Sequence, residues 1–455
     1  MSDTNSPLIL GTKPIGKLLL QYSIPAIIAM TVTSLYNIID SIFIGHGVGP
    51  LGITGLAVTF PLMNLVIAFC TLVAIGGATI SSIYLGQKDF VRATEVLENV
   101  LILCIITAFC FGGLTLLFLD PILIFFGASR ETLPYAHDFM EVILIGSPIS
   151  YVFIGLNNIM RATGYPRKAM LSSLLTVGAN IILAPIFIFH FDWGIKGAAF
   201  ATVCSQSLAM LWVIHHFRNK GSFIHFDKTY RKLKKRIVLS IFSIGMSPFL
   251  MNACACAVVI IINNALRSYG GDLAIGAYGI VNRMLTLFVM IVIGVTQGMQ
   301  PIIGYNYGAR QFDRVRKTLK YGIIAGVTIT TFGFVVSELF PHMIVAMFTT
   351  SNELTELATT GLRIACLMFP FVGCQIVISN FFQSIGHAKV SIFLSLSRQL
   401  LFLIPCLILL PRYWGTEGVW ASMPMSDFVA FVVAIVALGV HFKKVRKQSL
   451  PVVTD

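Results

Sequence analysis

Apolar runs of about 20 residues recur from one end of this 455-residue chain to the other. Each run can cross a bilayer whose hydrocarbon core is about 30 Å thick, because an α-helix rises about 1.5 Å per residue. Only 11% of the residues are charged, whereas a soluble protein carries about 25%. A soluble enzyme, a disordered chain and a secreted disulfide scaffold are therefore excluded. The sequence predicts an all-α membrane protein that crosses the bilayer many times.

We expect twelve transmembrane helices, several of them long enough to tilt or kink. Prolines within the runs, such as Pro25, remove a backbone hydrogen bond and can bend a helix. The expected spans are residues 15–44, 51–84, 96–119, 134–160, 168–190, 195–217, 237–266, 272–305, 318–340, 356–384, 389–411 and 416–442.

The positions of Lys and Arg predict the orientation, because short cytoplasmic loops carry an excess of both. With the N-terminus in the cytoplasm, 25 of the 32 Lys and Arg lie on the inner side, 4 on the outer side and 3 within spans. Both termini are therefore expected in the cytoplasm. The same distribution explains the net charge of +13 without a nucleic-acid partner.

The second half of the chain repeats the first at an offset of 221–223 residues. Four blocks keep their order: 23–25 matches 246–248, 86–92 matches 308–314, 158–164 matches 380–386, and 192–197 matches 413–418. Six spans return a chain to the side where it started, so the two halves share one orientation.

This duplication predicts two six-helix lobes related by a pseudo-two-fold axis along the membrane normal, with a transport path between them. We expect an N-lobe at 1–217, a basic cytoplasmic linker at 218–236, a C-lobe at 237–442 and a cytoplasmic tail at 443–455.

Asp40 is the ionisable residue that most strongly suggests function. A charge in hydrocarbon costs about 2.5–3.5 kcal/mol at the centre of a span, so such residues are functional candidates. Asn37 lies one helical turn earlier on the same face. Asp40, Asn180 and Thr202 lie about 7, 15 and 11 Å from the outer ends of their spans. If they meet, they form an oxygen-rich pocket for H⁺ or for a hard cation such as Na⁺; a purely structural hydrogen-bond cluster is the alternative.

The C-lobe offers different chemistry. The position equivalent to Asp40 is Asn263, which cannot ionise. Asp427 lies in the middle of the last span with no obvious partner. Three arginines also lie deep in spans, where each could join a hydrogen-bond network or face an aqueous cavity: Arg283, Arg363 and Arg398.

Motifs that would indicate an enzyme do not occur. The chain has no Gly-x4-Gly-Lys-[Ser/Thr] phosphate loop, no His-Glu-x2-His and no Gly-x-Ser-x-Gly. None of the nine cysteines forms a Cys-x-x-Cys pair. We therefore expect no enzymatic activity, no cofactor and no metal centre apart from the Na⁺ alternative at Asp40.

Several segments are together similar to one known family: Pro25 and residues 36–40, 86–88, 158–164, 180–188 and 193–199. Over nearly its whole length the chain resembles the multidrug and toxic compound extrusion (MATE) transporters, in their bacterial DinF-like and MepA-like branch. This resemblance implies export of organic, often cationic compounds in exchange for H⁺ or Na⁺. It also places coupling roles on Asp40, Asn180 and Thr202.

The chain departs from the family pattern at Ala184, where relatives commonly carry an aspartate four residues after the span-5 asparagine. The acidic residues that some relatives place in spans 7 and 10 are also missing. A cation site built on two carboxylates is therefore weakened, and H⁺ is favoured over Na⁺.

Substrate contacts are suggested by family analogy together with polar or polarisable side chains. Methionine forms adaptable surfaces that accept varied apolar cations, although packing in the core is a common alternative role. The candidates are Met63, Asn64, Asn157, Met210, Arg283 and Gln297.

The resulting expectation is a monomeric secondary exporter that works by alternating access in the bacterial plasma (inner) membrane. The main alternative is a lipid or oligosaccharide-lipid flippase of the same broad superfamily. A flippase for anionic amphiphiles would need more basic groups along its path than the three deep arginines provide. An intramembrane enzyme and a receptor without transport are weaker alternatives.

Overall fold

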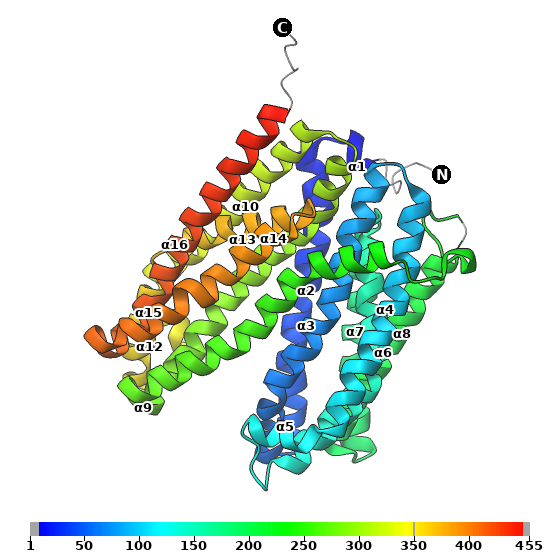
Figure 1. Cartoon of the computed structure of the whole chain (residues 1–455). Helices are drawn as coiled ribbons and strands as arrows, with labels where there is room; N and C mark the ends of the chain where they lie inside the picture. The colour runs from blue at the N-terminus through cyan, green and yellow to red at the C-terminus, as the bar shows by residue number, and fades with distance from the viewer. Residues whose placement is uncertain (1–8, 220, 349–350, 449–455) are drawn as a thin grey trace. The chain divides into compact units, whose positions relative to one another are not determined.

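A computed structural model shows a chain that is almost entirely helical (Figure 1). It describes residues 9–219, 221–348 and 351–448, excluding the side chains of residues 37, 38, 41, 50, 256, 272 and 444–448. No strand occurs in these ranges. The elements of the first half are α1 (Ile9–Thr12), α2 (Ile15–Gly47), α3 (Pro50–Gly86), α4 (Phe90–Leu117), α5 (Leu119–Phe125), α6 (Leu133–Ala162), α7 (Pro166–Pro185), the π-helical turn η1 (Ile186–His190) and α8 (Gly194–Arg218).

The second half begins after a short 3₁₀ turn, η2 (Lys228–Tyr230). Its long first element consists of two helices that meet at Gly271, and its last element is broken in the same way at Gly415. The elements are α9 (Lys235–Gly308), α10 (Phe312–Leu339), α11 (Pro341–Ala346), α12 (Asn352–Cys366), α13 (Phe369–Ser384), α14 (Ala388–Leu396), the π-helical turn η3 (Ser397–Leu403), α15 (Ile404–Leu409) and α16 (Pro411–Gln448).

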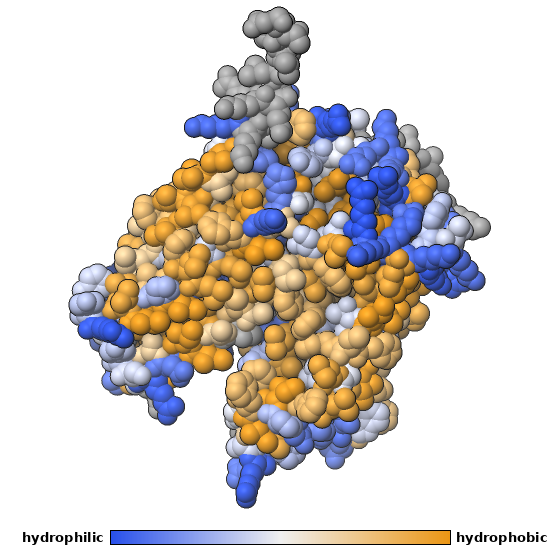
Figure 2. Space-filling view, in the orientation of Figure 1, coloured by the Kyte–Doolittle hydropathy of each residue, from blue (hydrophilic) through white to orange (hydrophobic). Residues whose placement is uncertain are grey.

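The helices confirm an all-α membrane protein. Among the described residues, eleven helices are long and apolar enough to cross a bilayer. The pair α12 and α13, bent by 52°, gives a twelfth span if it is counted as one. On the face shown in Figure 2, apolar side chains cover the middle of the helices and hydrophilic ones gather at helix ends.

The duplication is visible in the backbone as well as in the sequence. Lys88 and Arg310 occupy equivalent positions, and both adopt the left-handed conformation that non-glycine residues rarely adopt, with φ of 59° and 58°. Phe118 and Phe340 begin equivalent short helices with φ of −120° and −126°. Three glycine pairs at the same offset also have positive φ in both halves: Gly49 and Gly271, Gly164 and Gly386, and Gly194 and Gly415. The two halves therefore share their turn geometry.

The chain forms two compact units whose borders differ from those of the sequence repeat. The first comprises Met1–Ala253, Gln297–Thr318 and Ser384–Gly386, and the second comprises the rest. Both ends of α9 therefore belong to the first unit. The predicted lobe borders at 217 and 237 remain a prediction.

Within the first unit, α6 packs against α3, α4, α7 and α8. A second seam joins α3 to α9 by direct backbone contact, which is typical of small residues in membrane helices. A Cβ atom on Gly86 would lie 1.9 Å from the carbonyl oxygen of Tyr305, and one on Gly308 would lie 2.1 Å from that of Ile83. Any side chain at either glycine would force the two helices apart.

The core of the second unit is built around Trp420 of α16, which is 1% exposed and packs near Tyr278 of α9. Gly361 of α12 makes room for this indole, because a Cβ there would lie 2.6 Å from the Trp420 ring. Phe288 and Phe369 extend the same core. These contacts fix α9, α12 and α16 of this unit around one aromatic centre.

The end of the expected linker is held against α4. The fully buried carboxylate of Glu98 accepts hydrogen bonds from the Asp227 N–H at 2.9 Å and from Arg231 Nε at 3.0 Å. Asn99 accepts from the Lys234 N–H at 3.0 Å. A charge-assisted hydrogen bond to a buried carboxylate is stronger than a neutral one. Residues 227–234 are therefore docked on the helical bundle.

Candidate functional site

Three polar side chains from three helices meet inside the first unit. Tyr36 of α2 and Thr202 of α8 share a hydrogen bond of 3.0 Å between their hydroxyl oxygens. The amide nitrogen of Asn180, in α7, donates to both, at 3.2 Å to Tyr36 and 3.1 Å to Thr202. Asn180 is 2% exposed, and Tyr36 and Thr202 are half-buried. The structure thus joins Asn180 and Thr202, two of the three residues expected at the site, to Tyr36. Their role in ion coupling stays a prediction.

The hydrogen bonds of this cluster follow a single consistent pattern. Thr202 also donates to the Ala198 carbonyl at 3.2 Å, which uses its only hydroxyl proton. Tyr36 must then donate to Thr202, and the Thr202 oxygen accepts from both Tyr36 and Asn180. The Thr202 oxygen is therefore filled as an acceptor, and Asn180 presents its amide NH₂ group to the cluster.

Asp40 lies one helical turn after Tyr36 in α2 and is 8% exposed. No hydrogen bond joins Asp40 to Asn180 or Thr202, and its Oδ1 atom has no partner among the side chains that the structure describes. The carboxyl lies near enough to Tyr36 to act electrostatically on the phenol. A buried carboxylate without a counter-charge is costly. Its free oxygen is therefore a place where a proton or a cation can bind.

Asn37, Ala184 and the expected metal alternative add little to the description of the site. The side chain of Asn37 lies outside the described residues. Ala184, on the next turn of α7 after Asn180, is fully buried. In the described part of the chain, no three His, Cys, Asp or Glu side chains come together as a metal site.

Tyr36 is the member of the cluster that the sequence did not single out. Its position four residues before Asp40 places it on the same face of α2, and that spacing was the available signal. A phenol carries no charge at neutral pH, so Tyr36 does not stand out in an apolar span as Asp40 does. In the structure, Tyr36 is hydrogen-bonded to Asn180 and Thr202 and lies one helical turn before Asp40.

Two of the expected substrate contacts are engaged in helix packing. The Asn157 amide of α6 donates to the Ala169 carbonyl at 2.9 Å and to Ser172 Oγ at 2.6 Å, which ties α6 to α7. Gln297 of α9 accepts a hydrogen bond from the buried guanidinium of Arg161 and contacts the Met30 sulfur at 3.8 Å. Their role in substrate binding stays a prediction.

The remaining candidates are dispersed. Met63 and Asn64 of α3 and Met210 of α8 are half-buried in the first unit. Arg283 of α9 belongs to the second unit and is exposed. No contact among the described residues brings them together, so their assignment also remains a prediction.

The three arginines expected deep in spans belong to the second unit, where Arg283 and Arg363 are exposed and Arg398 is half-buried. Asp427 of α16 accepts from Arg398 Nε of η3 at 2.6 Å, so it has the partner that the sequence did not suggest. Arg363 lies 3.6 Å from Glu338. Two of the three arginines that a flippase for anionic amphiphiles would need are therefore already paired.

We predict that Tyr36→Phe destabilises the protein. Removing the phenol oxygen leaves the Asn180 amide with one acceptor fewer, and a lost buried hydrogen bond costs about 1 kcal/mol of unfolding free energy. Thermal unfolding of the purified protein measures the change. Tyr413→Phe, at a side chain that is 81% exposed, is the control. Equal melting temperatures for the two variants would show that the Tyr36 hydroxyl contributes nothing.

Comparison with known families gives the identity of the fold. The MatE family model matches residues 25–186 and 244–408, which is one match in each half of the chain. The chain belongs to the MatE family. Members of this family are transporters, so the protein is a MATE transporter and not an enzyme.

Relatives of this MATE chain match it almost end to end. It is 29% identical over 438 residues to the multidrug export protein MepA of Staphylococcus haemolyticus, covering 96% of both chains. The solved structure of the MATE multidrug transporter DinF-BH is 34% identical with a TM-score of 0.87, over 94% of this chain and 96% of that one. An outward-facing MATE family transporter of the MOP superfamily shares the fold, with a TM-score of 0.90 at 24% identity over 98% of this chain and 99% of that one.

Proposed function

We propose that this MATE transporter exports organic, often cationic compounds in exchange for an inward-moving ion, with H⁺ as the ion. The relatives MepA and DinF-BH are named for multidrug export and multidrug transport, which supports the cargo class. The observation that carries the coupling proposal is the buried Asp40 carboxyl with an unpartnered oxygen beside Tyr36.

The hydrogen-bond pattern favours H⁺ over Na⁺. Na⁺ needs several oxygen lone pairs around it. Asn180 turns its NH₂ group, not its carbonyl, towards Tyr36 and Thr202, and the Thr202 oxygen already accepts two hydrogen bonds. A proton needs only one free oxygen, which Asp40 Oδ1 offers.

In the proposed cycle, Asp40 alternates between charged and protonated forms as the transporter alternates between outward and inward access. Protonation removes the charge that acts on Tyr36 and changes how α2 packs against α7 and α8. Pro25 leaves one backbone hydrogen bond of α2 unmade, so the helix can bend there. Release of the cargo and return to inward access follow from this repacking.

We also propose that both termini are cytoplasmic, in a bacterial inner membrane, and that one chain is the working unit. The distribution of Lys and Arg supports the orientation. One chain already carries both duplicated halves, so it needs no second copy to form a path between them.

Transport in proteoliposomes tests the proposal. Efflux of ethidium is followed by fluorescence while a pH gradient and a Na⁺ gradient are imposed separately. We expect the pH gradient alone to drive efflux and the Na⁺ gradient alone to have no effect. Efflux driven by Na⁺ alone would reverse the choice of ion. Scrambling of labelled phospholipid without ethidium efflux would favour a flippase.

A further inference from the structure

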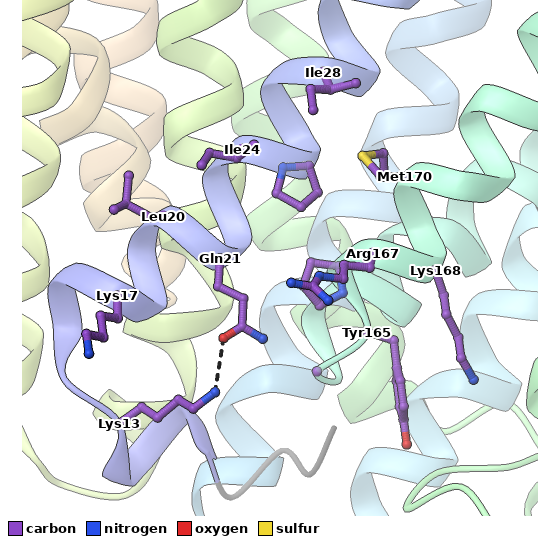
Figure 3. A pocket seen from close by; sticks show the side chains of 13 residues that line it. Lys13, Lys17, Leu20, Gln21, Ile24, Ile28, Tyr165, Arg167, Lys168 and Met170 are labelled. Atoms are coloured by element: carbon purple, nitrogen blue, oxygen red, sulfur yellow. Dashed lines mark hydrogen bonds between the residues drawn. The ribbon is translucent and has the colours of Figure 1, made fainter. Parts of the chain in front are cut away.

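A cavity of about 640 Å³ lies between the beginnings of α2 and α7, inside the first unit (Figure 3). Four basic side chains line it: Lys13 between α1 and α2, Lys17 in the first turn of α2, and Arg167 and Lys168 in the first turn of α7. Figure 3 shows the α2 side chains on one side and Tyr165, Arg167 and Lys168 on the other. Among the residues that the structure describes, no acidic residue lines the cavity.

The positive charge of this cavity is not neutralised by the described part of the chain. Lys13 donates to Gln21 at 3.3 Å, and Lys168 lies 3.3 Å from His216 Nδ1, so both have neutral partners. Lys17 and Arg167 are exposed and form no ion pair with any described residue. Four cations without a counter-ion favour an anionic ligand.

The cavity continues along α2 as an apolar wall. Leu20, Ile24 and Ile28 follow Lys17 at helical spacing and are 60%, 50% and 39% exposed. Met170 of α7 lines the same cavity. The ligand that fits therefore has an anionic head at the basic end and an apolar part along α2.

The depth of the cavity matches the interface between lipid headgroups and acyl chains. Lys17 lies in the first turn of the span that begins at Ile15, and Arg167 lies in the first turn of the span that begins at Pro166. Basic side chains at the ends of membrane helices reach the headgroup level.

We propose that this cavity binds an anionic phospholipid, with its phosphate between Lys17 and Arg167 and an acyl chain along Leu20, Ile24 and Ile28. A volume of about 640 Å³ holds a headgroup and the adjoining part of the chains. The bound lipid bridges α2, which carries Asp40, and α7, which carries Asn180. Lipid occupancy therefore stabilises the contact between these two helices.

Native mass spectrometry of the purified full-length protein tests this site, with phosphatidylglycerol and phosphatidylcholine as probes. We expect tighter binding of phosphatidylglycerol, because each cation near an anionic headgroup contributes about five-fold in affinity. The double variant Lys17→Gln/Arg167→Gln should bind phosphatidylglycerol about 30-fold more weakly than wild type. Lys232→Gln/Lys235→Gln changes net charge equally at two other exposed basic residues, and should bind as wild type.

Two further arms separate the lipid from a soluble ligand. Ile24→Ser should weaken phosphatidylglycerol binding and leave the binding of inorganic phosphate unchanged. Equal affinity for phosphatidylglycerol and phosphatidylcholine, or equal losses in the two double variants, would overturn the proposal. Inorganic phosphate binding as tightly as phosphatidylglycerol would assign the site to a soluble phosphate instead. Binding is measured without transport, so the result is independent of the proposed export activity.

Discussion

Asp40→Asn is expected to reduce pH-driven efflux of ethidium to the level of protein-free liposomes. The asparagine side chain has nearly the same shape as the protonated aspartate, but it cannot release a proton. The variant should still bind ethidium, because binding does not require the helices around residue 40 to move. Fluorescence assays of efflux and of ethidium binding on the same preparation measure both properties.

Asp192→Asn is the matched control for this variant. Asp192 is exposed and has a φ of 53°, a conformation that asparagine also adopts readily. The same chemical change there should leave efflux intact. If Asp40→Asn kept the pH-driven efflux of the wild type, Asp40 would have no part in coupling.

The ion pair of Arg398 and Asp427 should give the largest change in stability. Asp427→Asn leaves the Arg398 guanidinium without its partner in the membrane region, and breaking a buried pair costs about 3 kcal/mol or more of unfolding free energy. The side chains are 32% and 8% exposed. The double variant Arg398→Met/Asp427→Leu should recover much of the loss, because neither charge then remains. Denaturant titration in detergent measures the unfolding free energy of the wild type, the single variant and the double variant.

An exposed pair in the same unit provides the comparison. Glu338 and Arg363 are 3.6 Å apart, with side chains 32% and 52% exposed. Glu338→Gln should cost less than about 1 kcal/mol, because water screens the pair. Similar losses for Asp427→Asn and Glu338→Gln would mean that the Arg398–Asp427 pair is no more important than a surface ion pair.

The sequence predicted the fold well because hydropathy and duplication are properties of whole segments. Apolar length located the spans, and the matching blocks anticipated turns as unusual as those at Lys88 and Arg310. The docking of residues 227–234 on α4 was not predicted, because a basic linker has no periodicity to place it. The docking depends on Glu98, which a hydropathy profile registers only as a charged break in an apolar run.

The role of the candidate site stays a prediction. The sequence named Asp40, Asn180 and Thr202 as residues that could meet; the structure hydrogen-bonds Asn180 to Thr202 and leaves Oδ1 of Asp40 without a partner. Tyr36 was missed because its phenol carries no charge, and its one signal in the sequence was the spacing of four residues from Asp40. The partner of Asp427 was missed because Arg398 lies 29 residues earlier on a different helical element, and helical spacing relates side chains only within one helix.

The contact between α3 and α9 at Gly86 and Gly308 has a consequence for protein engineering. Backbone atoms touch there with no room for even a methyl group. Libraries that randomise the transporter for new cargoes should leave these two positions unchanged. Almost every substitution there would prevent α3 and α9 from packing, so its effect on cargo selectivity could not be measured. Diversity is better directed to half-buried side chains such as Met63 and Met210, where a change of size does not push two main chains apart.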